Sequence, residues 1–127
     1  MTTLVTGATG FLGSHIARQL AGRGERVRVL ARASSDARAL AGLRLERVEG
    51  DLRDPASLAR ALDGVRRVFH VAADYRLWAR HPQEIYESNV TGTRNLLEAA
   101  RRAGVERFIY TSTVGTIIVP GAPGLPN

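Results

Sequence analysis

The amino-acid sequence predicts an α/β fold, a doubly wound parallel sheet with helices on both faces. Short β-rich runs alternate with stretches of helical periodicity along the chain. A glycine-rich turn follows the first of these runs directly and opens the first helix. Because crossover connections between parallel strands are right-handed, we expect about five strands in the order 3-2-1-4-5.

The length of the chain favours one domain. It has 127 residues, of which 44% are apolar, enough to build a core. No stretch approaches the roughly 20 unbroken apolar residues of a transmembrane helix. The N-terminus shows neither the basic start nor the apolar centre of a secretion signal. We therefore expect a cytoplasmic domain covering residues 1–127, with no membrane partner.

Composition argues against several kinds of site. The absence of cysteine excludes disulfides, thiolate zinc sites and a cysteine nucleophile. His15, His70 and His81 show no metal-ligand spacing, so no metal is expected. The net charge of +6 suggests nucleic-acid binding, but every basic residue is an arginine and these are scattered. We expect no nucleic-acid partner, although the positive field can attract an anionic cofactor.

The predicted elements follow from periodicity and from turn residues. Strands are expected at 2–6, 26–31, 43–48, 65–73 and 106–111, and helices at about 12–22, 35–42, 54–62 and 82–103. The nearly continuous apolar run near the end of 65–73 is typical of a buried parallel strand. The proline-rich and glycine-rich tail at 120–126 is expected to be a loop.

The long helix at 82–103 has an apolar face. Its predicted buried positions are Tyr86, Val90, Leu97 and Ala100, with Ile85 and Leu96 on the flank. Gly104 is expected to end the helix. Tyr110, on the last strand, is expected to lie in the core.

The glycine-rich turn spells T-G-x-x-G-x-x-G from Thr6 to Gly13. Gly7 permits a tight turn, Gly10 a close approach of the backbone to a pyrophosphate, and Gly13 the packing of helix on strand. Since the turn lies between a predicted strand and a periodic helix, it predicts a dinucleotide site. A strand-to-helix turn without a ligand is the alternative.

Five motifs occur in the order found in a known family. They are the glycine-rich turn, Gly50-Asp51-Leu52, His70-Val71-Ala72-Ala73, Asn89-Val90-Thr91-Gly92-Thr93 and Tyr110-Thr111-Ser112-Thr113. Together they resemble the extended branch of the short-chain dehydrogenase/reductase superfamily, the NAD-dependent epimerase/dehydratase proteins, which have a Rossmann-type sheet. The segments 73–80 and 82–86 resemble the dihydroflavonol-reductase-like group, and within it the hopanoid-associated sugar epimerases.

The resemblance implies a set of nucleotide-binding residues. They are Gly7, Thr9, Gly10, Phe11, Leu12, Gly13, Asp51, Leu52, Ala72, Ala73 and Asn89. For Asn89, purely structural hydrogen bonds on the helix are the alternative.

The end of the second strand indicates which nucleotide is bound. An NAD site has a carboxylate there for the ribose hydroxyls, but this chain has Ala31 followed by Arg32. A guanidinium suits a 2′-phosphate, and Ser34 and Ser35 can add hydroxyls. NADP is therefore favoured over NAD. The alternatives are that Arg32 is simply solvated or that Asp36 turns back toward the ribose.

The resemblance also implies catalytic positions. The hydroxyl that orients the substrate falls on Thr113, with Ser112 adjacent, unless these hydroxyls merely end a strand. Tyr75 and Trp78 lie on the loop that faces the nicotinamide in this family and are candidates for substrate contact. The family's Tyr-x-x-x-Lys pair is absent, because the chain contains no lysine.

The leading hypothesis is the N-terminal portion of an NAD(P)-dependent oxidoreductase or epimerase. Hydride transfer on a sugar-nucleotide or a dihydroflavonol-like substrate is expected, with a homodimer compatible with the resemblance. The alternative is a non-catalytic NADP sensor. Because the last strand has an open edge beside Ile117-Ile118-Val119, we expect a fragment or partner-dependent chain, inactive alone and truncated before the last strands.

Overall fold

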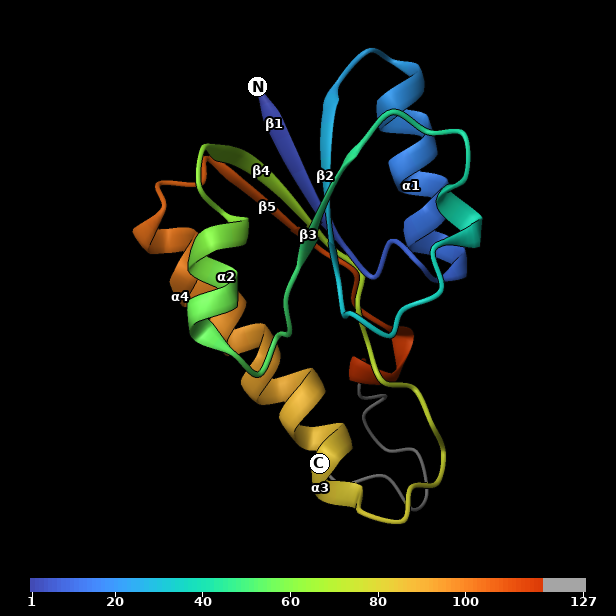
Figure 1. Cartoon of the computed structure of the whole chain (residues 1–127). Coiled ribbons are helices and arrows are strands. Elements are labelled where there is room, and N and C mark those ends of the chain that lie inside the picture. Colours follow the sequence, from blue (N-terminus) through green and yellow to red (C-terminus); the bar gives the residue numbers. More distant parts are fainter. Residues whose placement is uncertain (118–127) are drawn as a thin grey trace.

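The computed structural model describes residues 1–117, which form a parallel sheet with helices on both faces (Figure 1). The strands are β1 (Thr2–Thr6), β2 (Arg26–Ala31), β3 (Glu46–Glu49), β4 (Val65–His70) and β5 (Arg107–Tyr110). The α-helices are α1 (Phe11–Gly22), α2 (Pro55–Ala61), α3 (Pro82–Tyr86) and α4 (Gly92–Arg102), joined by short helical segments η1 (Arg38–Leu40), η2 (Glu87–Thr91) and η3 (Val114–Thr116).

The strand order is β3-β2-β1-β4-β5, with every pair parallel, as the sequence predicts. Thr6, the last residue of β1, pairs with Leu30 of β2 and His70 of β4. The carboxyl ends of the strands therefore meet at one edge of the sheet. In such folds this edge, where the strand order reverses, is where ligands bind.

The central strand β1 is buried along its whole length, and its side chains enter two cores. Leu4 packs against α2 and α4 on one face, with Leu58, Leu96 and Ala100 among its buried neighbours. Val5 packs on the other face, in the cluster that includes Leu20 of α1. Figure 1 shows α1 on one side of the sheet and α2 and α4 on the other. This burial holds the glycine-rich turn at the end of β1.

The turn between β1 and α1 leaves no room for side chains at two of its glycines. Gly7 has a φ of +70°, and a Cβ there would lie 2.6 Å from the backbone nitrogen of Ala72. A Cβ on Gly13 would lie 2.1 Å from the carbonyl oxygen of Gly7. The roles predicted for Gly7 in the tight turn and for Gly13 in helix packing are confirmed.

The segment between β2 and β3 differs from the prediction. Of the helix expected at 35–42, only the 3₁₀ turn η1 forms. The Asp36 carboxylate accepts hydrogen bonds from the backbone and side chain of Arg38, and this local bonding competes with a helix. β3 begins at Glu46 rather than at 43, because Leu43 and Leu45 pack against the α1 side of the core.

The strand predicted at 65–73 ends at His70. The next two backbone N–H groups, of Val71 and Ala72, donate to the Thr6 hydroxyl at 3.2 Å. A side chain thus replaces the strand pairing, and the chain leaves the sheet.

The helix predicted at 82–103 forms as α3, the π-helical segment η2 and α4. Of its four predicted buried positions, only Ala100 is confirmed. Leu96 and Ala100 are buried, whereas Tyr86, Val90 and Leu97 are exposed. A π-helical turn holds more residues than an α-helical turn, so it shifts Tyr86 and Val90 relative to the buried face of α4. Leu97 lies within α4 itself, on a face that stays exposed.

Tyr110 is also not in the core, since its side chain is 54% exposed. It lies on β5, the outermost strand on its side of the described sheet. The expectations for Ile118, Val119 and the loop at 120–126 fall outside the described residues.

Two glycines at opposite ends of α1 give a matched test of the turn. Gly13→Ala is expected to destabilise the protein by about 2 kcal/mol or more, because the new methyl group meets backbone that cannot move cheaply. Gly22→Ala is the control, since a Cβ there meets no atom within 4 Å. Urea unfolding of the two variants measures the difference, and equal stabilities would contradict the packing role of Gly13.

Candidate nucleotide-binding site

The predicted site residues gather at the carboxyl edge of the sheet. Each group directly follows a strand: Thr9 to Gly13 after β1, Arg32 after β2, Asp51 and Leu52 after β3, Ala72 and Ala73 after β4, and Ser112 and Thr113 after β5. Asn89 is brought to the same edge by η2. The fold thus collects residues that are scattered over a hundred positions of sequence.

The start of α1 offers uncapped backbone N–H groups. Gly10 is the N-cap residue, and no side chain caps the helix. A Cβ on Gly10 would meet only the Gly7 carbonyl oxygen, at 3.4 Å, so the space beside this residue is open. Phe11 and Leu12 are exposed next to it. Free N–H groups at the positive end of a helix, with open space before them, suit a phosphate group.

A buried polar network lies directly behind the turn. The Thr6 hydroxyl is 2.7 Å from Nδ1 of His70, and Nε2 of His70 is 2.8 Å from the hydroxyl of Thr93 on α4. His70 is 1% exposed, and its ring stacks on Tyr110 with centroids 5.4 Å apart. Burial lowers the pKa of His70 to about 4, so the ring is neutral near pH 7.

Asn89 holds the chain that follows β4. Its side-chain oxygen accepts from the backbone N–H of Asp74 at 2.7 Å, and its side-chain nitrogen donates to the carbonyl of Asp74 at 2.7 Å. Asn89 therefore acts on the backbone, which is the structural alternative considered for it. Through this pair of bonds it also fixes the loop that leaves the nucleotide edge.

The turn after β3 is fixed from two sides. The Ser57 hydroxyl accepts from the N–H of Asp51 at 3.0 Å, and the side chain of Asn95 donates to the carbonyl of Leu52 at 3.0 Å. Arg53 forms hydrogen bonds with the Asp51 carboxylate and lowers its pKa. Asp51 is therefore an anionic acceptor at the edge where an adenosine is predicted.

Arg32 is exposed and directly follows β2. Its carbonyl accepts from Arg47 at 3.2 Å, which fixes its backbone. Its positive charge also helps to lower the pKa of Asp51 and of Asp74, although Arg53 and Arg76 contribute more. The guanidinium thus lies within electrostatic reach of the residues that follow β3 and β4.

The predicted catalytic and substrate residues are exposed. Thr113 accepts from the backbone N–H of Gly115 at 3.3 Å, so its oxygen caps η3, while Ser112 lies beside it. Tyr75 is 90% and Trp78 is 78% exposed on the loop after β4. These residues share the carboxyl edge with the glycine-rich turn.

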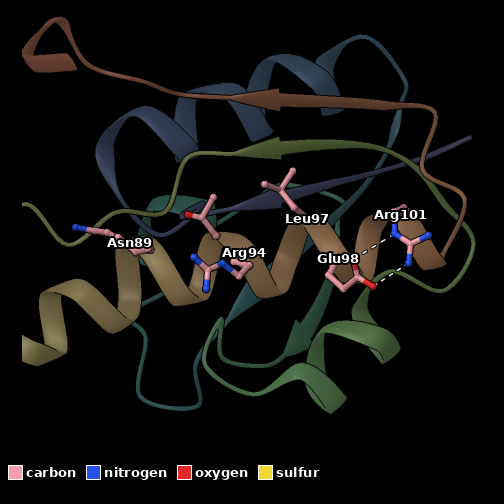
Figure 2. Close-up of a pocket in the computed structure, with 7 residues that line it drawn as sticks. Asn89, Arg94, Leu97, Glu98 and Arg101 are labelled. Carbon is pink, nitrogen blue, oxygen red and sulfur yellow. Dashed lines mark hydrogen bonds and ion pairs between the residues drawn. The ribbon is translucent and has the colours of Figure 1, made fainter. Parts of the chain in front are cut away.

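A hollow of about 690 Å³ lies along η2 and α4 (Figure 2). It is lined by Asn89, Val90, Thr93, Arg94, Leu97, Glu98 and Arg101. Within residues 1–117, no three metal-ligating side chains come together, and no helix is long and apolar enough to cross a membrane.

Sequence reasoning did not assign a site role to Thr6, His70, Thr93, Ser57 or Asn95. Thr6, His70 and Thr93 lie inside the recognised motifs, and the first two are polar side chains at the end of an apolar strand. That pattern is the signal that could have found these two, because a buried polar group requires a partner. Thr93, Ser57 and Asn95 carry no such signal, because their neighbours in the sequence include polar and charged residues.

The parallel sheet with its strand-order reversal, and a glycine-rich turn leading into a helix N-terminus, define a Rossmann-type fold. The sequence model of the NAD dependent epimerase/dehydratase family matches residues 3–123. The chain therefore belongs to this family, and the family assignment made from the motifs is confirmed.

Similar proteins include enzymes of several kinds. Sterol demethylase protein B of Methylococcus capsulatus is 51% identical over 92% of this chain and 36% of its own length. A Synechocystis protein provisionally named as a dihydroflavonol 4-reductase is 47% identical over 92% of this chain and 34% of its own length. The Thermus thermophilus UDP-glucose 4-epimerase in complex with NAD is 37% identical, with a TM-score of 0.75, over 85% of this chain and 36% of that one.

The chain thus spans about a third of the length of these relatives. They support the dihydroflavonol-reductase-like grouping, while the hopanoid-associated subgroup stays a prediction.

The buried imidazole makes stability depend on pH. The folded protein binds a proton at His70 only below about pH 4, whereas an unfolded histidine binds one below about 6.5. Stability is therefore expected to be complete above pH 6.5 and to fall by about 3 kcal/mol as the pH drops to 4. Urea unfolding across this range measures it.

His70→Gln should remove this part of the pH dependence, and the exposed His81→Gln should leave it intact. A profile that is the same in all three proteins would contradict the assignment.

Proposed function

We propose that this chain is the nucleotide-binding portion of an NAD(P)-dependent oxidoreductase or epimerase. The observation that supports it most is the turn after β1. Gly7 and Gly13 are packed against backbone, while Gly10 faces open space at an uncapped helix N-terminus. A turn that needed glycines only for packing would not leave this third position open.

The residues present fit a dinucleotide. The N–H groups at Phe11 and Leu12 would hold the pyrophosphate, since that of Gly10 already donates to the Gly7 carbonyl, and the turn at Asp51 and Leu52 would contact the adenosine. Ala72 and Ala73, which follow β4, would border the nicotinamide half. When bound, the nicotinamide supplies a carbon that gives or takes a hydride.

We further propose a preference for NADP over NAD. Arg32 is exposed where an NAD site would have a carboxylate. A guanidinium can form a bidentate charge-assisted pair with a 2′-phosphate. The Thermus thermophilus epimerase was solved with NAD, so the preference is a property proposed for this chain and not for its relatives.

For the whole protein we propose hydride transfer at a carbonyl or carbinol of a sugar nucleotide or of a dihydroflavonol-like compound. The hydroxyl of Thr113 would orient the substrate oxygen, and Tyr75 and Trp78 would contact the body of the substrate. The tyrosine and lysine that move the proton in this family fall on no residue of residues 1–127, which contain no lysine. The proposal for this chain alone is therefore binding without turnover.

Gly10→Ala tests the phosphate site. The variant should fold as the wild type does, because the methyl group meets only one atom at 3.4 Å, but it should weaken NADPH binding tenfold or more, an effect of about 1.4 kcal/mol. Nucleotide fluorescence titration gives the affinity and circular dichroism checks the fold.

Gly22→Ala, at the far end of α1, is the matched control and should bind as the wild type does. Unchanged binding by Gly10→Ala would overturn the proposed site. Binding without turnover in the full-length protein would instead favour a nucleotide sensor.

Arg32→Ala tests the nucleotide preference. Loss of a charge-assisted pair costs about 1.5–3 kcal/mol, so NADPH should bind roughly 10-fold to 100-fold more weakly while NADH binding changes little. Arg44→Ala, at an exposed arginine between η1 and β3, is a control for the loss of one positive charge elsewhere in the chain. Equal affinity of the wild type for NADPH and NADH would show that Arg32 does not bind the 2′-phosphate.

A further inference from the structure

His70 links two elements that the proposed nucleotide site needs. Its ring lies between the end of β1 and the helix α4, with both nitrogens within hydrogen-bond distance of a threonine hydroxyl. The ring does not contact the open edge where a ligand would bind, since it is 1% exposed. Any effect on the site through hydrogen bonds of the ring must therefore pass through Thr6 and Thr93.

The hydrogen-bond partners fix the tautomer of the ring. The Thr6 hydroxyl accepts from the N–H groups of Val71 and Ala72, both at 3.2 Å. A hydroxyl has two lone pairs and one proton, so with both lone pairs engaged its proton goes to Nδ1 of His70. Nδ1 is thus the acceptor, and Nε2 carries the ring proton and donates to Thr93.

The helix holds the chain after β4 at two points. The hydroxyl of Thr93 forms a hydrogen bond with His70. Asn89, four residues earlier, forms hydrogen bonds with both the N–H and the carbonyl of Asp74. The segment 71–73 is therefore tied to the helix at each end. Because this segment is packed against Gly7, its position sets that of the glycine-rich turn.

We propose that His70 is a positioning residue of the nucleotide site, which acts by joining Thr6 to Thr93 through its Nε2–H tautomer. The inference rests on the proposed nucleotide function. A histidine that merely filled the core would need neither this tautomer nor the hydroxyl of Thr93. Its other neighbours are aromatic: Tyr110 stacks on the ring, and Phe108 lies with its centroid 6.1 Å away. No charged side chain in residues 1–117 forms a hydrogen bond or ion pair with it.

The tautomer can be read directly by nitrogen NMR of the full-length protein labelled at histidine. The nitrogen shifts of His70 are expected to show an unprotonated Nδ1 and a protonated Nε2, unchanged from pH 8 to pH 5. The opposite tautomer, or a ring that becomes charged near pH 6.5, would overturn the proposal even if no variant could be purified.

Three threonine variants of the full-length protein test the link to binding. Thr93→Val removes the hydroxyl that His70 bonds and should weaken NADPH binding about fivefold, the equivalent of one neutral hydrogen bond. Thr93→Ser keeps the hydroxyl and should restore the affinity. Thr91→Val, on the same helical stretch, leaves both hydrogen-bond partners of His70 in place and should bind as the wild type does.

The outcomes separate the two proposals. Wild-type affinity in a folded Thr93→Val protein would overturn the positioning role and leave the nucleotide site standing. Failure of Thr93→Ser to recover the affinity would also overturn it, because the hydroxyl would then not be the cause. A folded wild type that binds no nucleotide would overturn the proposed function, and the positioning role with it.

Discussion

Between Gly7 and Ala72 the backbones of two neighbouring segments approach so closely that no side chain fits between them. This contact is possible because Gly7 adopts a positive φ and because β1 and β4 are adjacent parallel strands that end together. The start of α1 follows from it, since Gly13 must then pack its own backbone on the Gly7 carbonyl. The site that we propose for a nucleotide is the open side of this packed turn.

The space behind the turn is polar, yet its donors and acceptors are matched. The hydroxyl of Thr6 receives two backbone N–H groups and faces the ring of His70, which in turn reaches Thr93. Within residues 1–117, no buried side-chain nitrogen or oxygen lacks a partner. A fully satisfied network of this kind favours a single arrangement. Any shift leaves a polar group unpaired in the low-dielectric interior, where an unpaired polar group costs free energy. The glycine-rich turn is therefore held in place by hydrogen bonds as well as by apolar packing.

The sequence predicts the strand order, the glycine roles and the gathering of motifs at one edge, because these depend on local periodicity and on chain topology. It does not predict the exposure of Tyr110 or Leu97, because burial on an outer strand or helix face depends on which elements cover it. At η1, the hydrogen bond from the Arg38 N–H to the Asp36 side chain outweighs helix propensity, so only a short turn forms. Sequence periodicity does not predict the hydrogen-bond network of His70, because Thr6, His70 and Thr93 are brought together only by the sheet and α4.

The π-helical segment η2 has a consequence for how this chain can change in length. Residues 87–91 contain Asn89, and the regular helix that follows contains Thr93, and both reach the chain after β4. Deleting one residue from η2 would leave a continuous helix with regular backbone hydrogen bonds. It would, however, rotate the residues before the deletion by about 100° around the helix axis relative to α4. Asn89 would then leave Asp74 while Thr93 stayed in place. The length of this stretch is therefore constrained by the position that Asn89 must reach, and not by the backbone hydrogen bonds of the helix itself.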